Sequence, residues 1–334
     1  MSNKIVKGIK NPEVAASILY RESKEAIVRS KLELYRRQRD IQRQKHLIKE
    51  FASQDEFILV ILDACRYDVF EDIYCDHLGG ELSRVWSSGR WTADYVSRTW
   101  DNSHDLTYLS SIPVVSDFYF ELRDKKFRPN SCFDKVVPLW DKKWDPELGT
   151  VPANEVTNTA LAYSAQSDRT RLVAHYAQPH APYVGDTMIL PWDSEEIEHD
   201  LQELLEKDID RPSRRIYNRI KSGELPESEL WQAYRDNLEY VLNEVVRLIR
   251  RVSCPVVVTA DHGEHLGEDN KYLHEEESCL IRQVPWFIVS DSEIGTIPIE
   301  EKYQSVELAN DSHTQSSDEV KERLTDLGYI NEGT

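Results

Sequence analysis

The chain has 334 residues, 40% of them hydrophobic and eight of them tryptophan, so it can bury the core of one large domain or at most two. Its net charge of −19 is uneven: residues 1–50 carry 13 Lys and Arg against 6 Asp and Glu, whereas the rest carries 28 against 54. An acidic main body excludes nucleic-acid binding through that body.

The N-terminal stretch Met1–Lys7 lacks the apolar centre of a signal peptide, and no run in the chain approaches twenty apolar residues. We therefore expect a soluble, cytoplasmic protein with no transmembrane segment. The five cysteines are odd in number and show no CxxC spacing, which favours free thiols over disulfides or a zinc ribbon.

Residues 13–50 contain no Gly or Pro and repeat an apolar residue at every seventh position, which predicts one or two helices. This stripe consists of Tyr20, Ile27, Leu34, Ile41 and Ile48. The positions four residues after its first four members are polar, whereas a coiled coil needs apolar residues there, so we expect docking against the main domain. The basic charge leaves two interpretations: contact with an anionic membrane or a partner, and a solvated helix on the acidic body.

Further along the chain, apolar runs alternate with helical patterns. The predicted strands are 56–62, 82–87, 106–110, 171–177, 255–260 and 284–289. Prolines between 112 and 150 predict long loops with a short strand near Val136 and Val137. The predicted helices are Glu195–Lys207, Ser213–Ser222, Ser228–Arg251 and, after a polar loop at 291–315, Asp318–Leu327. This order predicts an α/β fold: a doubly wound, mostly parallel central sheet with helices on both faces.

Two of the strands end in carboxylates. The run Phe57–Leu62 stops at Asp63, and Pro255–Ala260 stops at Asp261 and His262. Because ligands of open α/β sheets bind at the carboxyl ends of strands, we expect these side chains to converge on one cation. Oxygen and nitrogen ligands together favour Mn²⁺ or Zn²⁺, and an all-oxygen set would favour Ca²⁺ or Mg²⁺. The alternative is structural, since an Asp after a strand often only caps the next helix.

A third segment, Trp86–Tyr95, follows the short strand at 82–87 and contains Gly89, Trp91 and Thr92. With Asp63 and the late run Thr259–Glu268, it resembles the alkaline phosphatase/sulfatase superfamily, in particular its archaeal sulfatase-like branch. In that family a late TxDHGExLGE segment supplies metal ligands, and a hydroxyl or thiol nucleophile begins a helix. The resemblance implies that Thr92 is the nucleophile and a fourth metal ligand. The alternative nucleophiles are Ser87, Ser88 and Ser97.

The chemistry of Thr92 is reasonable on its own terms, because metal coordination activates a hydroxyl that is otherwise a poor nucleophile. One departure from the family is informative. True sulfatases convert the Cys or Ser of a C/S-x-P-x-R motif to formylglycine, whereas this chain reads Thr-Ala-Asp-Tyr-Val from Thr92. We therefore expect phosphoryl chemistry in preference to sulfate-ester hydrolysis. The alternative is that Thr92 has no catalytic role and only caps the N-terminus of the helix that follows.

Three histidines complete the expected site. The segment His175–Tyr183 resembles the family's H-x-x-x-P-H-x-P-[YF] motif, which implies that His180 contacts the transferred or leaving group. Its imidazole could act as a general acid with a pKa near neutrality. His274 lies twelve residues after His262, at the spacing where relatives bind a substrate oxygen. We expect His274 and His175 to bind substrate, although a structural role is the alternative for His175.

These features predict a metal-dependent hydrolase of phosphate or sulfate esters that forms a covalent ester on Thr92. The alternatives are a phospho-group transferase that decorates a glycan or lipid head group, and a non-catalytic sulfatase-like scaffold. The expected partner is a small-molecule or glycan- or lipid-linked ester. We expect a basic helical extension at 1–50, the catalytic domain at 51–290 and a polar tail with a short helix at 291–334.

Overall fold

A central eight-stranded sheet organises the protein, which we describe from a computed structural model at residues 12–190, 212–274 and 276–306. The strand order is β1-β3-β10-β7-β2-β6-β4-β5, and every neighbouring pair is parallel except the two that involve β10. The strands are β1 (Gln42–Arg43), β2 (Phe57–Asp63), β3 (Gly80–Trp86), β4 (His104–Ser110), β5 (Phe133–Pro138), β6 (Arg171–Pro179), β7 (Val256–Ala260) and β10 (Gln283–Val289). A small hairpin adds β8 (His265–Leu266) and β9 (Tyr272–Leu273).

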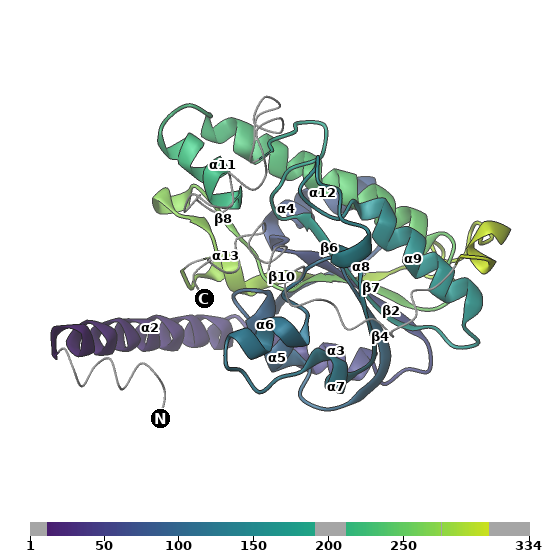
Figure 1. The fold of residues 1–334 in the computed structure, drawn as a ribbon, viewed down its shortest axis with the longest axis horizontal. Coiled ribbons are helices and arrows are strands. Elements are labelled where there is room, and N and C mark those ends of the chain that lie inside the picture. The colour runs from purple at the N-terminus through teal and green to yellow at the C-terminus, as the bar shows by residue number, and fades with distance from the viewer. Residues whose placement is uncertain (1–11, 191–211, 275, 307–334) are drawn as a thin grey trace.

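Helices cover both faces of this sheet. In Figure 1, α4, α9 and α12 lie above it, and α3, α5 and α7 lie below it. The helices are α2 (Pro12–Gln38), α3 (Gln44–Phe51), α4 (Tyr67–Ile73), α5 (Thr92–Thr99), α6 (Asp117–Leu122), α7 (Pro129–Cys132), α8 (Leu139–Lys142), α9 (Ala153–Gln166), α11 (Pro212–Lys221), α12 (Glu227–Ile249) and α13 (Cys279–Arg282). Short 3₁₀ turns lie at Tyr74–Asp76, Glu268–Asn270 and Glu301–Gln304. The predicted α/β fold with a mostly parallel sheet is confirmed.

The centre of the sheet is mostly apolar because it is covered on both faces. Every residue of β2 and of β7 is buried, and β2 lies between β6 and β7 with parallel pairing on both sides. An unbroken β-branched and aliphatic run is what such a position requires. Because β2 and β7 run in the same direction, Asp63 and Asp261 emerge at the same edge of the sheet.

The expected docking of the N-terminal apolar stripe is correct only for its last two members. Ile41 and Ile48 are buried at 7% and 1% exposure, whereas Tyr20, Ile27 and Leu34 are 74%, 58% and 56% exposed. The physical reason is visible in Figure 1, where α2 extends beyond the rest of the described chain and meets no surface that could cover them.

The C-terminal end of the N-terminal segment forms buried hydrogen bonds with the central sheet. The Gln44 side chain is completely buried and donates 2.7 Å hydrogen bonds to Thr259 Oγ1 and to the Ala260 carbonyl. Residues 42–51 therefore support the strand that carries Asp261. The expected domain boundary at residue 50 stays a prediction, as does the boundary at residue 290.

Elsewhere the structure adds to the sequence prediction. The segment 112–150 contains α6, α7 and α8 in addition to the predicted short strand, which is β5. Helix α9 had not been predicted. The predicted helices at 213–222 and 228–251 correspond to α11 and α12. Those predicted at 195–207 and 318–327 lie outside the described residues, and so does the end of the polar loop at 291–315.

All five cysteines are free, as the sequence predicted. Among the described helices, none is both long enough and apolar enough to cross a membrane.

Candidate metal centre and active site

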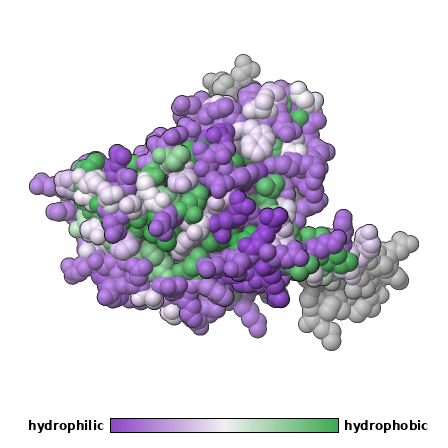
Figure 2. Space-filling model, turned by 180° about the vertical axis from the view of Figure 1, so that it is seen from behind, coloured by the Kyte–Doolittle hydropathy of each residue, from purple (hydrophilic) through white to green (hydrophobic). Residues whose placement is uncertain are grey.

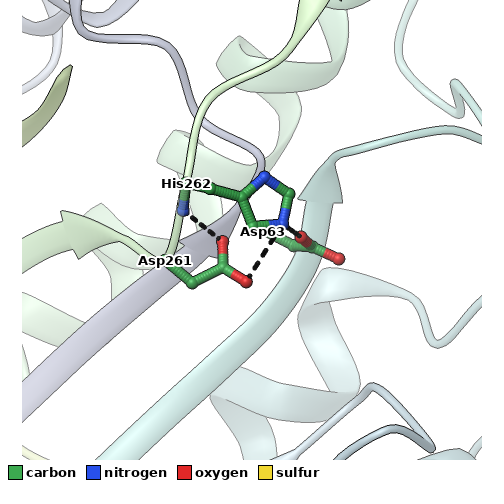
Figure 3. Close-up of side chains that lie close together, drawn as sticks. All are labelled: Asp63, Asp261 and His262. Atoms are coloured by element: carbon green, nitrogen blue, oxygen red, sulfur yellow. Dashed lines mark hydrogen bonds and ion pairs between the residues drawn. The ribbon is translucent and has the colours of Figure 1, made fainter. Parts of the chain in front are cut away.

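The ends of β2 and β7 bring three predicted ligands together (Figure 3). The Nε2 atom of His262 lies 3.4 Å from Asp63 Oδ1 and 3.4 Å from Asp261 Oδ2. One ligand atom from each of the three residues lies within 4.8 Å of the others, and all three side chains are buried.

The two 3.4 Å spacings from His262 Nε2 to the carboxylate oxygens fit a common metal ligand shell. Ligand atoms about 2.0–2.1 Å from a tetrahedral zinc ion are about 3.3–3.4 Å from one another. Asp63 Oδ1, Asp261 Oδ2 and His262 Nε2 are also buried without a hydrogen-bond partner. Buried polar atoms normally have partners, and an ion is one of the few explanations for several orphans at one place. The donor set therefore fits a divalent cation.

The hydrogen bond made by the His262 ring points the same way. Its Nδ1 lies 2.9 Å from the Gly263 carbonyl oxygen, which can only accept, so Nδ1 carries the proton in the neutral ring. In that tautomer the lone pair of Nε2 faces the two carboxylates, which is the usual arrangement for an imidazole that binds a metal. Burial, followed by the charges of Asp261 and Glu264, raises the pKa of Asp63 well above its usual value.

The backbone around the cluster is held in place. Asp261 Oδ1 accepts hydrogen bonds from the Ala64 amide at 3.1 Å and the His262 amide at 2.9 Å. Ala64 has a φ of 57°, a left-handed conformation that is unfavourable for alanine and typical of strained functional sites. The Tyr234 hydroxyl donates to the Ala64 carbonyl at 2.7 Å and so supports this turn after Asp63.

His175 lies beside the cluster, in the interior of β6. Its ring has no exposed surface, its Nδ1 is 2.9 Å from the Tyr108 hydroxyl and its Nε2 is 3.9 Å from Asp261 Oδ2. Burial lowers its pKa to about 4, so the ring is neutral at pH 7. These contacts favour a structural role in which His175 supports the Asp261 side chain. Binding of substrate by His175 stays a prediction.

His274 and His180 form the next layer around the centre. The ring centroid of His274 lies 4.6 Å from that of His262 and 5.8 Å from that of His180. Burial, and then the charges of His262, His180 and Arg90, lower the pKa of His274 well below its usual value. The structure therefore brings together two histidines that are 94 positions apart in the sequence.

The structure does not give His180 the pKa near neutrality that the sequence predicted. Burial, as the main cause, lowers its pKa to about 4. Its Nδ1 lies 2.8 Å from the Ala181 carbonyl oxygen and carries the proton there, so Nε2 is an acceptor at pH 7. A bound anion would favour the charged ring and raise this pKa again.

Thr92 is the first residue of α5, as expected for the nucleophile. Its side chain is completely buried, and its Oγ1 has no hydrogen-bond partner. The preceding loop is tied to the segment that carries Asp261 and His262, because the Ser87 hydroxyl donates to the Asp261 carbonyl. Gly89 is required there, since a Cβ would lie 2.2 Å from the Tyr95 amide nitrogen. Ser97 is occupied by a 2.6 Å bond to the Ala93 carbonyl, which leaves Thr92 as the better candidate.

The sequence alone did not indicate a role for Glu264, although this residue lies within the late run Thr259–Glu268. Its side chain is completely buried, and Oε1 lies 3.6 Å from His180 Nε2. Burial raises its pKa to about 8, so the carboxyl is mostly protonated at pH 7. Its neighbour His265 is 3% exposed and lies in β8, the first strand of the hairpin that follows the motif.

Arg66 links the loops that follow β2 and β7. Its guanidinium contacts Asp68 at 2.6 Å and also pairs with Glu268. It lies 4.8 Å from the ring of Trp231, and its backbone amide donates to the Tyr234 hydroxyl. Through these contacts Arg66 holds the loop after Asp63 to the loop that carries Glu268.

Comparisons with known proteins give structural likeness only. No protein-family model matches the chain, and no curated protein matches it. Among solved structures, it is similar to the soluble domain of lipooligosaccharide phosphoethanolamine transferase A from Neisseria meningitidis, with 16% identity, a TM-score of 0.41, and coverage of 70% of this chain and 76% of that one. The match to the integral membrane form of that protein covers 84% of this chain but only 59% of the membrane protein.

Two further structures are similar at the same level. One is the C-terminal periplasmic domain of EptC from Escherichia coli in complex with Zn, with 9% identity, a TM-score of 0.45 and coverage of 72% and 73% of the two chains. The other is a phosphonate monoester hydrolase from Silicibacter pomeroyi, with 15% identity, a TM-score of 0.40 and coverage of 73% and 70%.

Proposed function

We propose that this protein is a metal-dependent enzyme that cleaves or transfers phosphate esters through a covalent ester on Thr92. One observation carries the proposal. Four buried polar atoms without hydrogen-bond partners belong to the four residues that the sequence singled out as ligands. They are Asp63 Oδ1, Thr92 Oγ1, Asp261 Oδ2 and His262 Nε2. A scaffold protein would gain nothing from keeping these atoms unsatisfied, because each costs folding free energy.

A divalent cation held by these four residues would offset the charge of the two carboxylates and lower the pKa of the Thr92 hydroxyl. Zn²⁺ or Mn²⁺ suits the mixed oxygen and nitrogen donors best. The Thr92 oxygen would then bond to phosphorus while the bond from phosphorus to the leaving oxygen breaks. The start of α5 offers unpaired backbone amides that favour the incoming anion.

His180 and His274 would bind the oxygens of the transferred group. The His180 ring, charged while the anion is bound, would give its proton to the leaving oxygen. The ring would then be neutral and could accept a proton from the attacking water or acceptor alcohol when the Thr92 ester is resolved. Similar structures include enzymes named as phosphoethanolamine transferases and a phosphonate monoester hydrolase. Whether water or an alcohol is the acceptor decides between hydrolase and transferase.

The direct test is elemental analysis of the purified protein followed by a screen of phosphate monoesters, phosphate diesters and sulfate esters, each with and without an acceptor alcohol. We expect one bound divalent cation and a preference for phosphate esters, because no Cys or Ser occupies the position that becomes formylglycine in sulfatases. Sulfate release together with an aldehyde at any cysteine, detected by intact-mass analysis, would overturn this proposal.

Replacing either outer histidine should slow turnover and spare the metal. For His180→Gln and His274→Gln we expect kcat to fall roughly 10²-fold, because each ring stabilises charge on the transferring oxygens. Metal content should stay at the wild-type level, since neither ring contributes an orphaned atom to the inner cluster. The measurements are steady-state kinetics and elemental analysis, with the exposed His46→Gln as the control. Full turnover in both variants would show that neither histidine takes part.

A further inference from the structure

The exposed face of α2 has an unusual composition for a water-facing surface. Tyr20, Ile27 and Leu34 are each more than half exposed and repeat every seventh residue. On a helix with 3.6 residues per turn, they fall within a stripe about 40° wide that is about 21 Å long. Figure 2 shows green apolar residues where the described part of α2 leaves the body, beside the grey atoms.

The charges on α2 are segregated around this stripe. Lys24 and Lys31 lie one turn after Tyr20 and Ile27, on the same side, and neither forms an ion pair within the described part of the chain. Glu25 and Glu33 lie roughly 120–160° around the helix from Ile27. Both are neutralised by arginines: Glu25 pairs with Arg29, and Glu33 pairs with Arg36, Arg37 and Arg43. The exposed face is therefore apolar and cationic, with no acidic side chain among its described residues.

We propose that α2 is an interfacial helix that binds an anionic lipid surface through the face formed by Tyr20, Lys24, Ile27, Lys31 and Leu34. An apolar stripe flanked by lysines suits the boundary between head groups and acyl chains. The aromatic Tyr20 matches the preference of tyrosine for that boundary. The main body, with 28 basic against 54 acidic residues, would be repelled from the same surface, so only the projecting helix would make contact.

A second copy of the chain is the less suitable occupant. Pairing two α2 helices along the stripe would bring the lysines of one copy close to those of the other. It would also bring together two strongly acidic bodies. Like charges at those positions oppose a coiled coil, whereas an anionic membrane complements them.

The test is flotation of the full chain with phosphatidylcholine vesicles, either pure or containing roughly one third phosphatidylserine. We expect the chain to float with the anionic vesicles only and to be released as salt is raised. The double variants Ile27→Gln/Leu34→Gln and Lys24→Glu/Lys31→Glu should each reduce vesicle binding at least about tenfold. The matched controls, Ile288→Gln and Lys125→Glu/Lys126→Glu, change exposed residues outside α2 and should bind like the wild type.

Three results would overturn the proposal: no binding to either vesicle, equal binding to both, or an equal loss in the control variants. A dimer in sedimentation equilibrium that Ile27→Gln/Leu34→Gln makes monomeric, without vesicle binding by the wild type, would assign the stripe to self-association. None of these outcomes depends on the metal centre, since each measures binding and not turnover.

Discussion

Asp261→Asn is expected to abolish metal binding and activity while leaving the protein folded. Asp261 Oδ1 accepts two backbone hydrogen bonds, which an amide oxygen can also accept. Oδ2, the orphaned atom that faces His262, becomes an NH₂ group that cannot bind a cation. We expect the cation to be lost and turnover to fall by at least about 10³-fold. Elemental analysis, kinetics and urea unfolding measure the three effects.

The free energy of unfolding shows whether Asp261 acts as a metal ligand or only supports the fold. The metal-free Asn variant should be at least as stable as the metal-free wild type. Burial is the main cause of the raised pKa of Asp63 and the charge of Asp261 is the next, so removing that charge relieves one of the two main penalties on the ionised Asp63. Asp261→Ala removes both backbone bonds and should also be destabilised, by about 1–3 kcal/mol. Asp269→Asn, on an exposed side chain nearby, is the control. Stoichiometric metal in the Asn variant would exclude Asp261 as a ligand.

The inner part of the site could be predicted because it depends on sheet geometry. A buried strand has a recognisable composition, and the ends of parallel strands share an edge, so Asp63 and Asp261 had to emerge close together once β2 and β7 were neighbours. The contacts of His175 with Tyr108 and Asp261 could not be predicted in the same way. They depend on the order of β4, β6 and β2 in the sheet, which no local pattern specifies.

Two other features depend on tertiary structure in ways that sequence periodicity does not encode. The seven-residue stripe is continuous from Tyr20 to Ile48, yet only Ile41 and Ile48 are buried, because burial depends on where the body ends. Similarly, β10 resembles the other apolar strands in composition but runs antiparallel between β3 and β7. The pKa values of His180 and Glu264 follow from burial, which a motif does not reveal.

Thr92→Val is expected to reduce kcat by at least about 10³-fold without destabilising the protein. Valine has nearly the shape of threonine and lacks only the hydroxyl, whose oxygen is buried without a hydrogen-bond partner. Removing an unsatisfied polar atom should leave the free energy of unfolding unchanged or raise it by about 1 kcal/mol. Thr92→Ser keeps a hydroxyl at this position and should retain measurable turnover. Kinetics and urea unfolding of both variants provide the comparison.

The same helix offers a matched control. Thr99, at the other end of α5, is 5% exposed and also has a buried hydroxyl without a partner. Thr99→Val should therefore show the same small change in stability as Thr92→Val but keep full activity. Rapid quenching of the wild type with a phosphate ester should trap one phosphoryl group on the peptide that contains Thr92, and none should be trapped in Thr92→Val. If Thr92→Val turns over normally, or if the trapped group lies on Ser87 or Ser97, the nucleophile is a serine of this segment, and Thr92 only begins the helix.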